Sequence, residues 1–459
     1  MEYISTRGST SKVSFQDVLL SSLAEDSGLY LPESYPNLSG RLDELAELSY
    51  TDLAFQIVKA YTNDIFSEED LHSIIDRSYR YFQHEDIAPL VDFDQFQILE
   101  LFHGSTWAFK DYPLQFLGNL FSHVLEATDS RLNLLGATSG DTGSAAIYGV
   151  KGKPRMNIFM IHPENGISTI QKLQMTTIKE NNVFNISISG SFDDGQRIVK
   201  AIFNDKDFCQ KYNLGAVNSI NWVRIMSQLV YFFYSGLNFL KENPSDPLIY
   251  SVPTGNFGNI FAGYVAKQMG LPIHKLICAT NKNNILSEAI NHGIYKKGDV
   301  IKTITPSIDI QVSSNFERLL FESSGRNGTL IRQKYAEFEN SGEFLLEADI
   351  LSNIRNLFDA TEVNENEILD TINKIYRKYN YLVDPHTAVG IAAAQKTCNE
   401  KFIALGTASY KKFIPMYRDK IGIDILTPPD IEKLFTKNSI YRKLEPEIDE
   451  IKSFIVNSL

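Results

Sequence analysis

Residues 103–111 read His-Gly-Ser-Thr-Trp-Ala-Phe-Lys-Asp and place a single lysine, Lys110, among apolar and small residues. An ammonium group is strongly hydrated, and a lysine is rarely buried without a partner or a task. Apolar neighbours such as Trp107 and Phe109 favour the neutral amine, which can attack a carbonyl cofactor or act as a base. A structural interpretation stays open, because a lysine at a helix start can also extend its ammonium past apolar neighbours into water.

Two further segments have the layout of an anion site, in which a buried strand leads through a glycine-containing turn into a helix. The sequence predicts strands over 132–137 and 248–252, followed by the turns 138–143 and 255–259. The first backbone N–H groups of a helix are unpaired, and the helix dipole favours negative charge there. The 255–259 turn carries no lysine, which fits a phosphate monoester held by neutral donors. A plain tight turn that packs a helix on a sheet is the alternative.

The turn that begins at residue 138 combines three hydroxyl side chains with one carboxylate, in the order Thr138, Ser139, Asp141 and Thr142. Hydroxyl groups and backbone N–H groups at a helix start can bind a substrate carboxylate. Ordinary capping of the following helix by these residue types is the competing interpretation.

A third cluster lies at 218–224, where Asn218 and Ser219 precede Arg224. Amide and hydroxyl donors together with a guanidinium can bind a phosphate, because arginine offers two parallel N–H groups. A solvent-facing helix start is the competing interpretation here.

Composition narrows the class of protein. The chain has 459 residues, too many for one compact core, and a net charge of −12, which argues against nucleic acid and anionic membranes as partners. Its three cysteines, Cys209, Cys278 and Cys398, are widely spaced and fit a reducing cytoplasm better than a disulfide framework or a zinc site. No secretory signal or membrane-spanning run is visible, and no nucleotide-binding or metal-binding motif occurs.

Apolar spacing divides the chain in two. Residues 1–95 form a mostly helical N-terminal region, with helices predicted over 51–61 and 67–81. From residue 96 short apolar runs alternate with helical segments, which predicts an α/β fold with a mainly parallel sheet. Within this catalytic region, 96–459, we expect a helical insertion near 325–382, and residues 428–459 read as one or two amphipathic helices.

Several motifs, taken in order along the chain, resemble threonine synthases of the longer class found in many bacteria and fungi. The resemblance runs nearly from end to end. The segments that carry it are Tyr3–Gly8, Leu23–Glu33, Phe102–Asp111, Ser139–Gly143, Val252–Gly258, Ser313–Leu319 and Asp384–Gly390.

The resemblance implies a pyridoxal-phosphate enzyme of fold type II, the tryptophan-synthase-β type, with two open, mainly parallel-sheet subdomains. Such an enzyme is a lyase that converts O-phospho-L-homoserine and water to L-threonine and phosphate, the last step of threonine biosynthesis. It implies a small-molecule substrate, no metal, no nucleic acid, no membrane, a cytoplasmic location, and a monomer or homodimer.

The resemblance also assigns roles. Lys110 would carry the cofactor as a Schiff base and shuttle protons. The residues that would bind the cofactor with it are Gly255, Asn256, Phe257, Gly258 and Asn259 at its phosphate and Thr407 at its pyridine nitrogen. The residues that would bind the substrate are Thr138, Ser139, Asp141 and Thr142 at its carboxylate and Asn218, Ser219 and Arg224 at its phosphate.

At some positions this sequence differs from the residue that is usual in the family. Ser105 and Trp107 stand where proline and leucine are common, and Asn284 stands where aspartate is frequent. Two alternatives follow. The first is a phospho-lyase with the same fold and cofactor, which would release 2-oxobutyrate and ammonia. The second is a catalytically inactive relative that serves as a binding protein.

Overall fold

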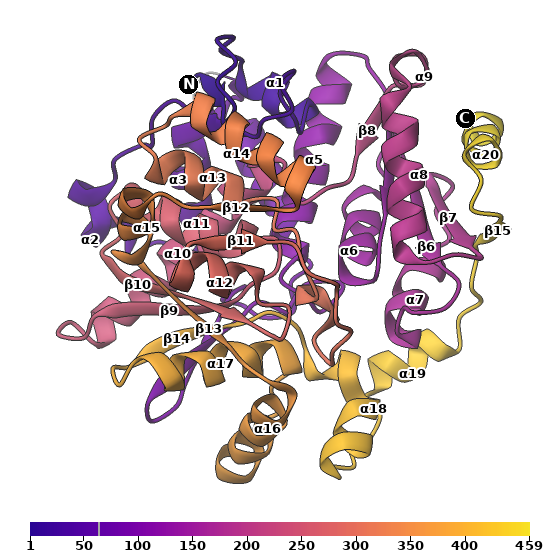
Figure 1. Cartoon of the computed structure of the whole chain (residues 1–459). Helices are drawn as coiled ribbons and strands as arrows, with labels where there is room; N and C mark the ends of the chain where they lie inside the picture. The colour runs from indigo at the N-terminus through magenta and orange to yellow at the C-terminus, as the bar shows by residue number, and fades with distance from the viewer. Residues whose placement is uncertain (63–64) are drawn as a thin grey trace. The chain divides into compact units, whose positions relative to one another are not determined.

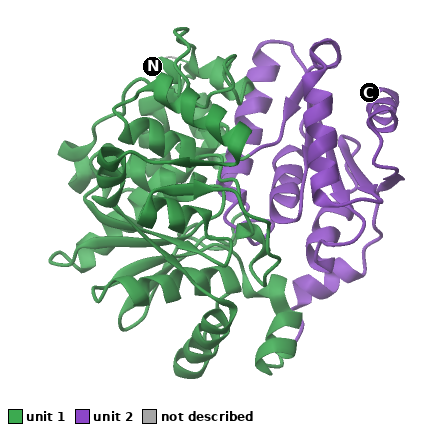
Figure 2. Ribbon diagram, viewed as in Figure 1, with its two compact units in different colours: residues 1–76, 82–103, 219–424 green, residues 77–81, 104–218, 425–459 purple. Residues whose placement is uncertain are grey.

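The computed structural model describes residues 1–62 and 65–459 (Figure 1). The chain divides into two compact units, which are coloured separately in Figure 2. Unit 1 comprises Met1–Asp76, Phe82–His103 and Ser219–Asp424, and unit 2 comprises Arg77–Tyr81, Gly104–Asn218 and Ile425–Leu459.

Unit 1 is built on a six-stranded sheet in the order β13-β10-β9-β14-β4-β3. All neighbouring strands are parallel except β3 and β4, which are antiparallel. Its strands are β3 (Leu90–Asp92), β4 (Phe96–Glu100), β9 (Leu248–Pro253), β10 (Ile273–Thr280), β13 (Phe358–Glu362) and β14 (Phe402–Gly406). Two antiparallel pairs accompany it, β1 (Tyr3–Ser5) with β2 (Tyr30–Pro32) and β11 (Ile294–Lys296) with β12 (Glu343–Leu345).

Unit 2 is built on a parallel five-stranded sheet in the order β15-β7-β6-β5-β8. The strands are β5 (Leu132–Ala137), β6 (Met156–Pro163), β7 (Val183–Ile188), β8 (Leu214–Ala216) and β15 (Arg442–Leu444). The central strands are nearly continuous apolar runs, as expected where helices cover both faces of a parallel sheet. In both units the chain therefore repeats the strand–turn–helix arrangement that brings loops to the carboxyl edge of the sheet.

The helices account for most of the remaining described residues. In unit 1 they are α1 (Phe15–Leu20), α2 (Leu42–Leu45), α3 (Tyr50–Thr62), α10 (Trp222–Glu242), α11 (Gly258–Gln268), α12 (Ile285–His292), α13 (Phe316–Ser323), α14 (Gly328–Ser341), α15 (Ala348–Arg355), α16 (Glu365–Tyr379), α17 (Pro385–Thr397) and α18 (Ile414–Met416). In unit 2 they are α5 (Asp111–Ala127), α6 (Asp141–Val150), α7 (Thr169–Thr176), α8 (Phe192–Asn204), α9 (Lys206–Lys211), α19 (Pro429–Phe435) and α20 (Ile448–Ser458), while α4 (Glu68–Tyr79) passes from unit 1 into unit 2.

The predicted fold class, α/β with two mainly parallel sheets and a helical N-terminal region, is confirmed. The helices predicted over 51–61 and 67–81 are α3 and α4. The prediction of a helical insertion near 325–382 was wrong in part, because that segment also contributes β12 and the edge strand β13. The C-terminal helices α19 and α20 form as expected, and the strand β15 between them was not anticipated.

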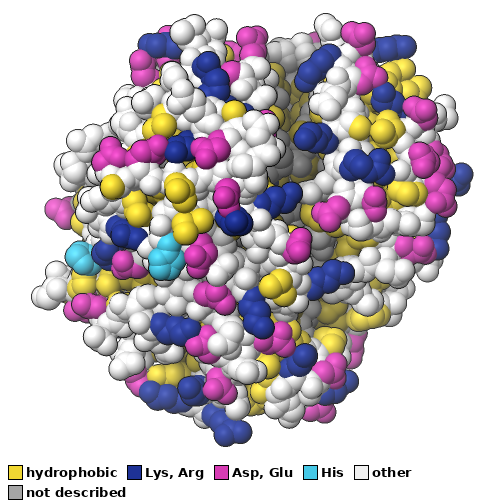
Figure 3. Space-filling model, viewed as in Figure 1, with side chains coloured by type: hydrophobic (Ala, Val, Ile, Leu, Met, Phe, Trp, Pro, Cys, Tyr) yellow, Lys and Arg dark blue, Asp and Glu magenta, His cyan; other side chains and the backbone are white. Residues whose placement is uncertain are grey.

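The described residues give the charge pattern of the surface and the hydropathy of the helices. On the face drawn in Figure 3, basic and acidic side chains are interspersed. Across the described residues, every helix is too short or too polar to cross a bilayer.

Candidate functional site

Lys110 stands at the end of a tight turn in unit 2, at the N-cap position of α5. The carboxylate of Asp111, which is fully buried, closes the turn by accepting hydrogen bonds from the backbone N and the Oγ1 of Thr106 at 2.7 and 2.8 Å. The Lys110 side chain is half-buried, and its Nζ lies 5.9 Å from the centre of the Phe109 ring. The apolar neighbour expected from the sequence is therefore present.

Trp107, one of the two unusual residues before the lysine, lies in this turn with φ +59°. A non-glycine residue in the left-handed region is strained by about 1–2 kcal/mol. Its side chain is buried and packs in an apolar cluster with Ile170, Leu173, Ile431 and Leu434. The indole thus fastens the lysine turn to α7 and α19.

In the turn after β5, also in unit 2, some polar side chains bond within the turn and others face outward. The Oγ1 of Thr138 accepts from the backbone N–H groups of Gly140 and Gly143 at 3.0 and 2.9 Å, and it donates to the Gly140 carbonyl. This hydroxyl therefore shapes the turn and starts α6, as in the capping interpretation. Ser139 is exposed and Thr142 is half-buried, so these two hydroxyls remain available to a substrate carboxylate.

Asp141 is directed inward, where its Oδ1 accepts from Nε2 of Gln171 at 2.8 Å. The same amide explains the glycine at position 140, which has φ +152°. A Cβ at this position would lie 2.6 Å from the Gln171 amide nitrogen. Gln171 was not predicted from the sequence, and it supports the turn rather than facing a ligand.

The glycine turn after β9, in unit 1, leads directly into α11. Phe257 takes the left-handed conformation at the N-cap, and no side chain caps α11. The backbone N–H groups of the first helical turn are therefore directed toward the space that precedes the helix. Within the described residues, the buried Nδ2 of Asn259 makes no hydrogen bond, while its Oδ1 accepts from the Tyr231 hydroxyl at 2.6 Å.

This donor set fits the phosphate of pyridoxal phosphate. It consists of an uncapped helix start, an amide N–H group without a partner, and glycines at 255 and 258 where the backbone must approach the anion. A buried, unsatisfied amide is costly in a folded protein, and an acceptor bound in the turn removes that cost.

Ser313 and Asn315 stabilise this turn by donating hydrogen bonds to its backbone carbonyls. The Ser313 hydroxyl donates to the Gly255 carbonyl at 2.7 Å. Asn315 donates to the Asn256 carbonyl twice, from its backbone N at 3.1 Å and from Nδ2 at 2.9 Å, and Nδ2 also donates to the Ser219 carbonyl at 3.2 Å. The turn predicted for the cofactor phosphate and the start of the segment predicted for the substrate phosphate are therefore joined by one side chain.

Arg224 lies in the first turn of α10 in unit 1 and is buried. Burial lowers the pKa of its guanidinium to about 10. A cation held at this cost of desolvation is suited to an anionic ligand. Ser219 and Arg224 thus belong to unit 1, whereas Asn218 is the last residue of the central segment of unit 2.

Thr407 follows β14, which pairs with β9 in parallel, so Thr407 and the 255–259 turn come to the same edge of the sheet. Its backbone N donates to the Thr387 hydroxyl at 3.2 Å. That hydroxyl in turn donates to Oδ2 of Asp384, the N-cap residue of α17.

His386 completes the arrangement at the start of α17. Its Nδ1 donates to Oδ1 of Asp384 at 2.9 Å, and its Nε2 accepts from the backbone N of Ser307 at 3.2 Å. The backbone at Ser307 and Ile308 passes close to Gly255, since a Cβ on Gly255 would lie 3.1 Å from the Ser307 carbonyl oxygen. The α17 start therefore supports both Thr407 and the glycine turn.

Sequence reasoning assigned no role to Asp384, His386, Thr387, Asn315 or Ser313, although it noted the motifs that contain them. One signal was available, since an aspartate followed by proline is typical of a helix N-terminus. It predicts a capped helix, and it carries no information on which loops the cap would hold.

His103 and His162, like His386, bond to neighbouring groups of the protein. His103 Nε2 bonds to Oε2 of Glu100 at 2.7 Å, and Glu100 also accepts from the Tyr381 hydroxyl. Burial lowers the pKa of His162, whose Nδ1 bonds to the Pro163 carbonyl. In the part of the chain that the structure describes, no group of His, Cys, Asp and Glu side chains is arranged to hold a metal ion.

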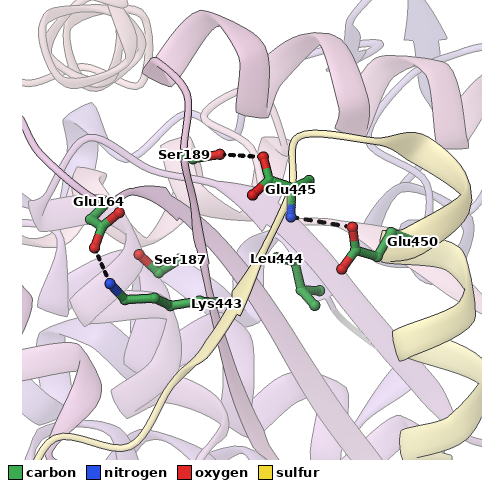
Figure 4. Close-up of a pocket in the computed structure, with 7 residues that line it drawn as sticks. All are labelled: Glu164, Ser187, Ser189, Lys443, Leu444, Glu445 and Glu450. Carbon is green, nitrogen blue, oxygen red and sulfur yellow. Dashed lines mark hydrogen bonds and ion pairs between the residues drawn. The ribbon is translucent and has the colours of Figure 1, made fainter.

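A pocket of about 160 Å³ lies elsewhere in unit 2, beside β7 and β15 (Figure 4). Lys443 pairs with Glu164, the Ser189 hydroxyl donates to Glu445 at 2.6 Å, and the Glu445 backbone N donates to Glu450 at 3.3 Å. Most of its polar groups bond to one another, and no residue predicted for the active site lines it.

Comparisons with known proteins agree along the whole chain. Family models described as "Threonine synthase N terminus" and "Threonine synthase, C-terminal" match residues 2–79 and 387–455. The threonine synthase of Pseudomonas aeruginosa is 43% identical over 99% of this chain and 98% of its own, and that of Saccharomyces cerevisiae is 39% identical over 100% and 98%. The crystal structure of PLP-bound threonine synthase from Brucella melitensis superimposes with a TM-score of 0.96 at 39% identity, covering 100% of this chain and 99% of that one.

Proposed function

The chain belongs to the threonine synthase family, and we propose that it is a pyridoxal-phosphate-dependent lyase that converts O-phospho-L-homoserine and water to L-threonine and phosphate. Pyridoxal phosphate supplies, when bound, the electron sink that removal of the α and β protons and loss of the γ-phosphate require. The chain must supply a base, an anion site for each end of the substrate, and a site for the cofactor phosphate.

Lys110 is the amine to which we assign covalent attachment of the cofactor and transfer of protons. Its side chain is half-buried, with Nζ 5.9 Å from the centre of the Phe109 ring, and the amine must lose its proton to act as a base or nucleophile. The Asp111–Thr106 hydrogen bonds hold its backbone in place, so that the amine is presented by a rigid turn.

The remaining roles go to groups that can donate hydrogen bonds. We assign the cofactor phosphate to the 255–259 turn and the pyridine ring nitrogen to Thr407. We assign the substrate phosphate to Asn218, Ser219 and Arg224. We assign the substrate carboxylate to the turn that starts at Thr138, where Ser139 and Thr142 offer hydroxyl groups. Thr138 and Asp141 hold the conformation of this turn through hydrogen bonds to Gly143 and Gln171.

The observation that carries the proposal is the position of Asn315. Its one amide group bonds to the carbonyls of Asn256 and Ser219, so the segments assigned to the two phosphates are fixed next to each other. Besides a carboxylate site, a fold type II enzyme that acts on a phosphorylated amino acid needs two phosphate sites, whereas a relative acting on an uncharged side chain needs only that of the cofactor.

We also propose that the protein acts in the cytoplasm on a small molecule, as a monomer or homodimer and without nucleic acid. Its three cysteines are free, and the net charge of −12 would repel nucleic acid.

The test is to incubate the holoenzyme with O-phospho-L-homoserine and to measure threonine, 2-oxobutyrate and phosphate together. We expect equal amounts of threonine and phosphate, and a loss of about 10²–10⁴-fold in rate for Lys110→Ala. Accumulation of 2-oxobutyrate in place of threonine would show a phospho-lyase. A purified chain that is colourless and does not bind added pyridoxal phosphate would refute the proposal that this protein is a pyridoxal-phosphate-dependent enzyme.

A further inference from the structure

The N-terminal residues Thr6 and Arg7 have no part in the proposed chemistry, yet both are fastened to the buried carboxylate of Glu317. Its Oε1 accepts from the Thr6 hydroxyl at 2.6 Å and from Arg7 Nε at 3.1 Å, and its Oε2 accepts from Arg7 Nη2 at 3.0 Å. The Arg7 and Glu317 side chains are only 16% and 4% exposed. A two-pronged pair of this kind fixes orientation as well as distance.

The next residue, Arg318, is a fully buried cation surrounded by oxygens. Its Nε and Nη2 donate to the Tyr30 carbonyl at 3.0 and 2.9 Å, and Nη2 also donates to the Ile220 carbonyl at 2.7 Å. Burial lowers the pKa of this guanidinium to about 9, and the neighbouring Glu317 carboxylate acts in the opposite direction. The Thr6 hydroxyl that donates to Glu317 also accepts from the backbone N of Leu29 at 2.7 Å, so the same network holds the chain next to Tyr30, whose carbonyl accepts from Arg318.

Arg318 also determines how the Asn315 amide is turned. Its Nη1 donates to Oδ1 of Asn315, which leaves Nδ2 on the opposite side. An amide nitrogen has two hydrogens, and the two acceptors of Nδ2 are the carbonyls of Asn256 and Ser219. A rotated amide would set an oxygen against both carbonyls, which removes the bond to Ser219 and leaves the Asn256 carbonyl with the Asn315 backbone N–H alone.

We propose that Thr6, Arg7 and Glu317 are positioning residues that set the cofactor-phosphate turn and the substrate-phosphate segment together. They act through Arg318 and the Asn315 amide. This inference rests on the proposed function for the identity of the two anions. It gives the N-terminal segment a specific task beyond packing on the catalytic sheet.

The test compares Arg7→Met with Arg7→Lys. Lysine keeps the positive charge but cannot donate two parallel hydrogen bonds to the Glu317 carboxylate. Lys12→Met is the matched control. Lys12 belongs to the same N-terminal segment, and its ion pairs with Glu2 and Glu33 are exposed. Two affinities are measured by calorimetry at a temperature where circular dichroism shows each variant folded. They are the affinity of the apoprotein for pyridoxal phosphate and that of the holoenzyme for inorganic phosphate.

We expect Arg7→Met to weaken both affinities about tenfold, the size of a coupling carried by one packed network, with a smaller loss for Arg7→Lys and none for Lys12→Met. Unchanged affinities, or loss of only one of the two, would overturn the inference, because a merely stabilising role lowers the melting temperature without changing binding by the folded chain.

If Arg7→Met does not fold, Thr6→Val against Thr6→Ser takes its place under the same criteria, since serine keeps the hydroxyl that donates to Glu317. Neither titration needs turnover. A wild-type chain that binds both ligands and makes no threonine would therefore refute the proposed function and leave this inference to be decided by the titrations.

Discussion

The Thr387 hydroxyl offers the sharpest test of how the start of α17 supports the site. It donates to the Asp384 carboxylate and accepts from the backbone N of Thr407, and all three residues are buried. Thr387→Val keeps a β-branched side chain of similar size and removes only the hydrogen-bonding atom. The change therefore isolates the polar contribution.

The expected magnitude follows from the two bonds. A hydrogen bond to a charged group contributes about 1.5–3 kcal/mol net, and a buried N–H left without a partner costs about 1–3 kcal/mol. Because one hydroxyl serves both groups, the two figures overlap, and we expect Thr387→Val to lower the free energy of unfolding by about 2–4 kcal/mol. Thr387→Ser keeps the hydroxyl and loses one buried methyl, which corresponds to about 1 kcal/mol.

The assay is urea unfolding of the apoprotein followed by circular dichroism, together with titration of each folded variant with pyridoxal phosphate. Affinity for the cofactor should fall for Thr387→Val and stay close to wild type for Thr387→Ser, because Thr407 keeps its support only in the latter. If the valine and serine variants had the same stability and the same affinity, the hydroxyl would not support Thr407 and the reasoning would fail.

Three further changes address other parts of the chain. Gly118→Ala should destabilise unit 2 by at least about 3 kcal/mol in urea unfolding, since its Cβ would lie 2.0 Å from a carbonyl oxygen of α6, whereas Gly40→Ala meets no atom within 4 Å and should be neutral. The pKa of Lys153 is lowered to about 8 by burial, with Arg77, Lys151 and Arg80 adding to the effect, against about 10.4 in an unfolded chain. Between these pH values the unfolded chain binds the extra proton, so the free energy of unfolding should rise by about 1–2 kcal/mol from pH 8 to pH 10.5, and Lys153→Met should abolish this rise. Asn284→Asp would set a carboxylate against Glu362, to which the amide now donates at 2.8 Å, and should cost below about 1 kcal/mol without changing kcat/KM.

The strand–turn–helix units were predictable because each of their signals is local. The run over 132–137 is apolar and short, a glycine turn follows it, and the helix begins where hydroxyl and acidic residues cluster; the structure has β5 and α6 at these places. The same reasoning located β9 and α11 on either side of the 255–259 turn. Periodicity and turn chemistry suffice where a strand is buried on both faces.

Edge strands gave no comparable signal. In β13, Phe-Asp-Ala-Thr-Glu, only the first and third residues are buried, and a polar five-residue run between helices resembles a loop. β15 has three residues and becomes a strand only by pairing Arg442–Leu444 with Ile186–Ile188 of β7, more than 250 positions away. Pairing over such a separation depends on the tertiary fold and leaves no trace in local spacing.

The residues that orient the loops escaped prediction for a related reason. Arg318 meets Tyr30, 288 positions earlier, and Asn315 meets Ser219, 96 positions earlier. Each contact is a side chain donating to a backbone carbonyl, and every residue type offers that acceptor. The motif around 313–319 could therefore be recognised as a unit, while the identity of the loops that it holds came only from the structure.

Trp107 differs from the leucine usual in the family, and the surrounding structure accommodates the larger side chain by packing. Its left-handed backbone conformation costs about 1–2 kcal/mol, which only a substantial gain from packing can offset. The indole is buried against Ile170 of α7 and against Ile431 and Leu434 of α19, and it covers more apolar surface than leucine would. The C-terminal segment therefore stabilises the strained turn that presents Lys110. The tryptophan changes the support behind the lysine rather than the groups proposed to react.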